Sequence, residues 1–118
     1  MVILDRTLAE VLSMLVDGAI IRSAYFIKDN IIIAYWPPDS LNDEVIELSK
    51  QVSPISRYDT VLLIYGRRLS SPYIALTLGY AVLLVKINKE ILCECRKLAK
   101  ILNALSSFSE RVNLIITS

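Results

Sequence analysis

The sequence predicts an α+β fold built from three helices and five strands. Three stretches carry apolar side chains at helical spacing, and five shorter stretches are apolar almost throughout, in the order α-β-β-α-β-β-β-α. Tight turns separate most consecutive strands, which makes these neighbours antiparallel. Because a chain of 118 residues holds one ordinary core, we expect a single domain.

The first helix and the hairpin after it are predicted from spacing and turn chemistry. An aliphatic stripe indicates a helix from about Asp5 to Asp17, and Gly18 follows where a left-handed backbone is favoured. The stretch Ala24–Trp36 predicts a β-hairpin with Asp29 and Asn30 as its two-residue turn. The second half of the hairpin does not alternate apolar with polar residues, so this strand is expected to be apolar on both faces.

The second helix is short and is predicted to begin at the N-cap Ser40 and to end near Val52, before Pro54. Acidic residues lie near its positive end, where the helix dipole favours them. They are Asp43, Glu44 and Glu47. Its apolar stripe consists of Leu41, Val45, Leu48 and Val52.

Three further strands and a long helix complete the predicted order. The strands are Thr60–Tyr65, Tyr73–Leu78 and Tyr80–Ile87. The helix is expected to start at the cap Asn88 and to run to about Ser106. Beyond it, residues 108–118 form an extension with an apolar piece, for which an extra strand and a docking tail are both open interpretations.

Composition indicates a protein that hides apolar surface against a partner. Hydrophobic residues make up 54% of the chain, above the usual 45–50%. No apolar run approaches the roughly 18 residues of a membrane span, and no signal peptide is visible, so we expect a cytoplasmic chain without membrane insertion. Cys93 and Cys95 are two residues apart in a predicted helix, so their side chains do not face each other. We interpret both as ordinary small residues in a reducing compartment.

The charges are segregated along the chain, although the net charge of +1 argues against nucleic-acid binding. Residues 1–50 carry eight acids and four bases, whereas residues 57–100 carry eight bases and three acids. Such segregation steers the association of unlike surfaces, and it is equally typical of solvated faces without a partner.

The sequence lacks the residues of the common catalytic and cofactor sites. Without histidine there is no Ser-His-Asp triad and no ordinary zinc site, and the three glycines do not form a phosphate-binding loop. We therefore expect no enzyme, no cofactor and no metal. Arg67 and Arg68 are compatible with an arginine finger, but solvated loop arginines are the default interpretation.

The first hairpin resembles the corresponding part of the roadblock (dynein light chain) domain. That family has an amphipathic helix, then a strand, an Asp-x-Asp-Gly-like turn and an aliphatic strand ending in alanine. Here Ile21–Asn30 followed by Ile31–Ala34 fits this frame, with Ser23 in place of a usual glycine and Asn30 in place of the turn glycine. Together with the element order, the resemblance covers about residues 4–107, and residues 1–107 are assigned as a roadblock-like domain. Longin and profilin domains share a similar layout.

The resemblance implies a five-stranded antiparallel sheet with helices on both faces, the first and third helices on one and the second on the other. It also implies a non-catalytic homodimer that binds or regulates a small Ras-like GTPase. The expected dimer interface is Leu41, Val45, Leu48, Val52, Val61, Leu63 and Tyr65. The expected partner-binding residues are Asp43, Glu44, Glu47, Arg67 and Arg68. The alternative is a longin- or profilin-like monomer that recognises a peptide or a trafficking partner.

Overall fold

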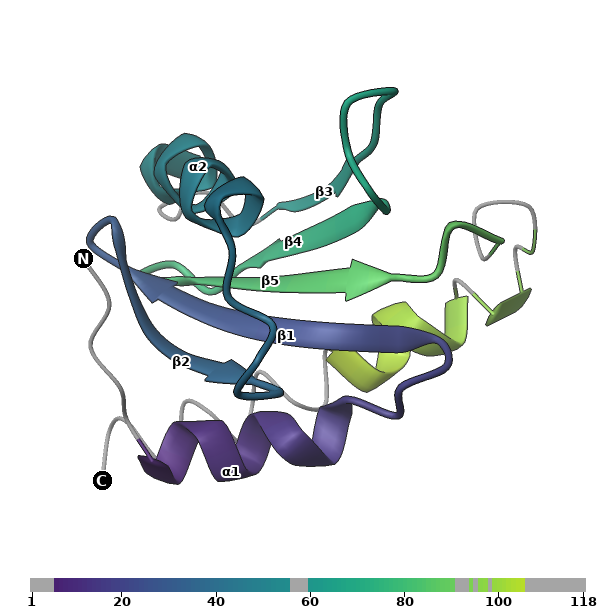
Figure 1. Cartoon of the computed structure of the whole chain (residues 1–118), viewed down its shortest axis with the longest axis horizontal. Coiled ribbons are helices and arrows are strands. Elements are labelled where there is room, and N and C mark those ends of the chain that lie inside the picture. The colour runs from purple at the N-terminus through teal and green to yellow at the C-terminus, as the bar shows by residue number, and fades with distance from the viewer. Residues whose placement is uncertain (1–5, 56–59, 91–93, 95, 98, 106–118) are drawn as a thin grey trace.

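The computed structural model describes residues 6–55, 60–90, 94, 96–97 and 99–105 (Figure 1). It confirms the α+β class and the predicted order of elements. Residues 96–97 and 99–105 are helical and supply the last helix. The labelled elements are α1 (Arg6–Leu15), β1 (Ile21–Lys28), β2 (Ile31–Trp36), α2 (Asp43–Val52), the 3-10 turn η1 (Ser53–Ile55), β3 (Val61–Ile64), β4 (Tyr73–Thr77) and β5 (Val82–Ile87).

The strands form one five-stranded sheet in the order β2-β1-β5-β4-β3, and every neighbouring pair is antiparallel. β1, β5 and β4 are therefore internal, and β5 is at the centre although it is the last strand among the described residues. β2 and β3 are the edges. The sequence predicts each strand but not this order, because local pattern does not specify which strands become neighbours.

The turns expected from the sequence have the predicted backbone. Asp29 and Asn30 have φ values of 52° and 65°, so both central residues of the first hairpin are left-handed. This is the turn whose twist matches that of the flanking strands. Gly18 has a φ of 81° and lies between α1 and β1, where a left-handed residue was expected.

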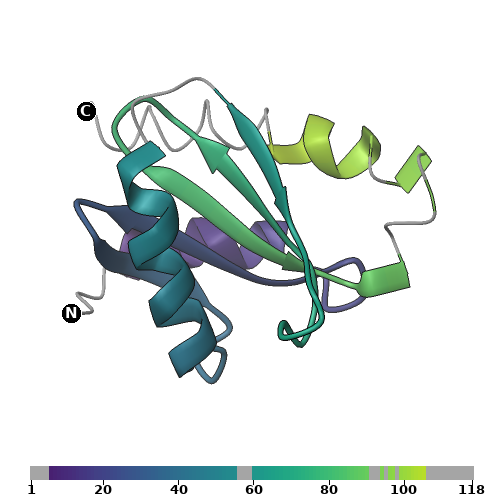
Figure 2. The same ribbon diagram turned by 90° about the horizontal axis from the view of Figure 1, so that it is seen from above.

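Helices lie on both faces of the sheet, and β3 is the strand that they leave most exposed. Figure 1 shows α2 above the sheet, with α1 and the helical residues 99–105 below it, and Figure 2 shows the same layers from above. On the lower side Phe26 and Leu83 pack with Leu12 of α1 and Leu105. The upper cluster joins strand residues to the α2 stripe and contains Tyr25, Ile27, Ile32, Tyr73, Ala75, Val82, Leu84, Val45, Leu48 and Val52.

The start of α2 differs from the prediction. Asn42, not Ser40, is the N-cap, and its side-chain oxygen accepts a hydrogen bond from the Val45 N–H at 3.0 Å. The Ser40 hydroxyl instead donates to the Pro37 carbonyl at 2.6 Å. Ser40 thus closes the turn after β2, and the helix begins at Asp43.

Some predictions lie outside the described residues. These are the assignment of Cys93 and Cys95 and the role of residues 108–118.

Candidate functional site

β3 is an apolar edge strand that the described residues leave partly uncovered. The exposed fractions of Val61, Leu62 and Leu63 are 49%, 38% and 42%. Leu62 pairs with Ala75 of the upper cluster, whereas Leu63 pairs with Ile74 of the lower one. Because paired residues share a face of an antiparallel sheet, β3 is exposed on both faces.

The backbone of β3 has groups on the open edge that pair with no strand in the part of the chain that the structure describes. The Thr77 N–H donates to the Thr60 carbonyl at 3.0 Å, so Thr60 bonds toward β4. Bonding direction alternates along an antiparallel strand, so Leu62 also bonds toward β4 while Val61 and Leu63 direct their N–H and C=O groups outward. An apolar strand with such an edge is a template for another strand.

The α2 part of the expected dimer interface is used inside the chain. Val45, Leu48 and Val52 have exposed fractions of 0%, 6% and 3%, and Leu41 is half-buried against the same cluster. These side chains pack on the sheet of their own chain, so they are not available to a second copy in this structure. Of the expected interface, Val61, Leu63 and Tyr65 are exposed.

The expected partner-binding residues divide in the same way. Glu44 is half-buried, and its Oε1 accepts hydrogen bonds from the hydroxyls of Tyr73 at 2.9 Å and Ser70 at 3.2 Å. These bonds tie the first turn of α2 to the β3–β4 connection and so place Glu44 in the same region as Arg67 and Arg68. The remaining four are exposed: Asp43, Glu47, Arg67 and Arg68.

Two buried tyrosines make a polar layer under α2 that sequence analysis did not find. The Tyr25 hydroxyl donates to the Ser40 carbonyl at 2.8 Å and shares a hydrogen bond with the Ser23 hydroxyl at 2.9 Å. Burial raises the pKa of Tyr25 and of Tyr73, and the hydrogen bond to the Glu44 carboxylate raises the pKa of Tyr73 further. Both phenols therefore stay neutral and serve as donors. Both tyrosines lie among apolar neighbours in β1 and β4, which concealed this role.

The described residues contain no group of histidine, cysteine, aspartate and glutamate side chains arranged to hold a metal ion. Within the same part of the chain, no helix is both long and apolar enough to cross a bilayer. No model of a known protein family matches the sequence, and no curated protein matches it either.

Proposed function

We propose that the chain is a non-catalytic scaffold that pairs with a second copy of itself through β3. In the paired state it binds or regulates a small Ras-like GTPase in the cytoplasm. One observation carries the self-pairing: among the described residues, β3 is an edge strand that exposes apolar side chains on both faces. The apolar composition supports it, because the unpaired chain leaves this strand in water.

The geometry favours antiparallel pairing of β3 with β3 about a twofold axis. A two-fold interface uses the same patch on both copies, and one edge strand is such a patch. Pairing satisfies the outward groups of Val61 and Leu63 and joins two sheets into one. It also buries the exposed side chains of β3 at the junction.

The GTPase part of the proposal depends on the resemblance to roadblock domains. Those domains act as paired platforms for GTPases, and the element order of this chain agrees with theirs. The charged loop with Arg67 and Arg68 lies just past the end of β3 and stays exposed. It is therefore the surface that a partner reaches beside a paired edge.

Light scattering tests the self-pairing. The chain has a mass of 13.3 kDa, and we expect twice this mass at micromolar concentration. Leu63→Lys places a charge on the edge strand, where lysine blocks pairing, and should return the mass to that of one chain. Met14→Lys is the matched control, because Met14 is 75% exposed on α1 and should not affect the mass. A single-chain mass for the unchanged protein contradicts the proposal.

The GTPase part of the proposal is tested by a capture experiment. The chain is immobilised and exposed to native lysate that has been loaded with GTP or with GDP. A Ras-like GTPase recovered more strongly in one nucleotide state supports the proposal. Recovery of none in either state removes the GTPase and leaves the self-pairing as a separate result.

The alternative function is a longin- or profilin-like monomer whose open edge accepts an extended peptide. The same edge supports it, because a peptide strand pairs with an exposed sheet edge through its backbone. The two functions predict different masses in solution. The alternative requires the unchanged protein to have the mass of a single chain.

A further inference from the structure

A hollow of about 390 Å³ lies beyond the end of β3, where the β3–β4 connection meets Lys89, two residues past the end of β5. Its volume falls within the range of about 300–1,000 Å³ that is typical of binding pockets. It is lined by Tyr65, Gly66, Arg67, Leu69, Ser70, Ser71, Pro72 and Lys89.

The hollow combines an apolar lining with an aromatic rim. Tyr65 is 68% exposed, which is high for a large aromatic side chain next to an apolar strand. Leu69 is half-buried and Pro72 is buried, so both belong to the wall rather than to the outer surface. This lining suits an aliphatic side chain of a bound segment.

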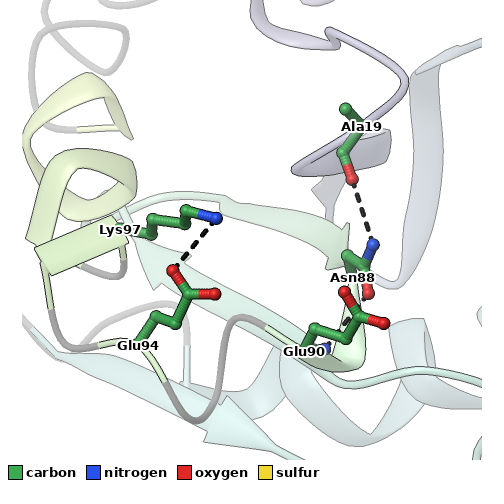
Figure 3. Close-up of polar contacts among 5 residues, drawn as sticks. All are labelled: Ala19, Asn88, Glu90, Glu94 and Lys97. Atoms are coloured by element: carbon green, nitrogen blue, oxygen red, sulfur yellow. Dashed lines mark hydrogen bonds and ion pairs between the residues drawn. The ribbon is translucent and has the colours of Figure 1, made fainter.

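Hydrogen bonds hold the lining in place from both sides. In the β3–β4 connection, the Leu69 N–H donates to the Gly66 carbonyl at 3.2 Å, and the Ser70 hydroxyl donates to Glu44. The two sequence neighbours of Lys89 are also bonded: Asn88 Nδ2 donates to the Ala19 carbonyl at 3.5 Å, and the Glu90 N–H donates to Asn88 Oδ1 at 3.1 Å (Figure 3). These bonds restrain the backbone on both sides of the hollow.

The charge at the hollow is positive and uncompensated. Arg67 and Lys89 are exposed and have no ion pair within the part of the chain that the structure describes, where the ion pairs are Lys50–Glu47 and Lys97–Glu94. Glu44 reaches the loop, but its Oε1 already accepts bonds from Ser70 and Tyr73. Two cations beside an apolar lining complement a carboxylate next to an aliphatic group.

We infer that this hollow binds an extended acidic segment of a partner protein. An aliphatic side chain of the segment contacts Tyr65, Leu69 and Pro72, and a neighbouring carboxylate lies between Arg67 and Lys89. A protein segment fits better than a free small molecule, because the hollow is open and buries little of a small ligand, whereas a partner adds contacts around it. The inference rests on the proposed function, whose partner-binding surface it localises.

The test is a titration of the ¹⁵N-labelled chain with the peptide Ser-Leu-Glu-Leu-Ser-Gly, followed by NMR. We expect amide shifts at Gly66, Leu69 and Lys89, and no response to the same peptide with lysine in place of glutamate. Arg67→Glu should weaken binding at least about tenfold, which corresponds to about 1.4 kcal/mol. Lys28→Glu is the control with the same charge change, because Lys28 is exposed at the hairpin turn.

Three results overturn the inference. The first is an absence of shifts at millimolar peptide, the second is equal binding of the lysine peptide, and the third is a response to inorganic phosphate alone. Repeating the titration on Leu63→Lys separates this inference from the self-pairing. Peptide binding by the unpaired variant shows that the hollow acts without the pair, while the mass of the unchanged protein alone decides the self-pairing. An unchanged protein that pairs and ignores the peptide refutes only the inference.

Discussion

β5 and β3 have nearly the same side chains, but β5 is buried and β3 is exposed. β5 begins Val-Leu-Leu-Val and is buried from Val82 to Val85, whereas β3 reads Val-Leu-Leu-Ile and is exposed from Val61 to Leu63. β5 lies at the centre of the sheet and β3 lies at its edge. Position in the sheet therefore decides burial, and apolar side chains at an edge remain available for binding.

The largest expected contrast is between alanine substitutions in these two strands. Leu84→Ala leaves a cavity in a fully buried site and should lower the free energy of unfolding by about 3 kcal/mol. Leu62→Ala removes a side chain that is 38% exposed and should cost less than about 1 kcal/mol in the unpaired chain. Denaturant unfolding at low protein concentration measures both. Equal losses would mean that β3 is packed as tightly as β5.

A second contrast compares a buried tyrosine with an exposed one. Tyr73→Phe removes the hydroxyl that donates to Glu44 at 2.9 Å and should cost about 1.5–2 kcal/mol, since bonds to charged groups are the stronger ones. Tyr65→Phe is the matched control, because Tyr65 is 68% exposed and should change stability by less than about 0.5 kcal/mol. Thermal unfolding of both variants decides whether the bond stabilises the attachment of α2.

The smallest expected effect is on pH dependence. The pKa of Tyr73 is raised by burial and by Glu44, so the unfolded chain releases this proton near pH 10 while the folded chain keeps it. The contribution of Tyr73 is therefore present below pH 10 and is lost as the pH rises above it. At pH 10.5 the wild type should lose about 0.8 kcal/mol more than Tyr73→Phe, relative to pH 8. Equal losses in the two proteins would show that Tyr73 ionises in the folded state.

Much of the fold was predictable from local chemistry. The left-handed pair Asp29 and Asn30, the glycine after α1 and the two-faced apolar strands all followed from side-chain types and spacing. The N-cap of α2 was placed at Ser40 although it is Asn42, because both side chains can accept the capping bond and only the turn at Pro37 decides between them. The strand order was not predictable, because no local signal joins β1 to β5.

The candidate site was predictable only in part. The apolar stripe of α2 shows that something covers it, but a stripe does not reveal whether the cover is the chain's own sheet or a second copy. The structure assigns Val45, Leu48 and Val52 to the chain's own core and leaves β3 open. The role of Glu44 depends on Tyr73 and Ser70, which are 29 and 26 residues away along the chain. No local pattern connects these residues.

Hydrogen exchange at the Leu63 amide is the most direct test of β3 as the pairing surface. In the single chain this amide faces the open edge, so it should exchange rapidly when the protein is dilute. Raising the protein concentration should protect Val61 and Leu63 and leave the already protected amide of Leu84 unchanged. If the protein has the mass of a pair and the Leu63 amide still exchanges rapidly, the interface lies elsewhere. This result would contradict pairing through β3.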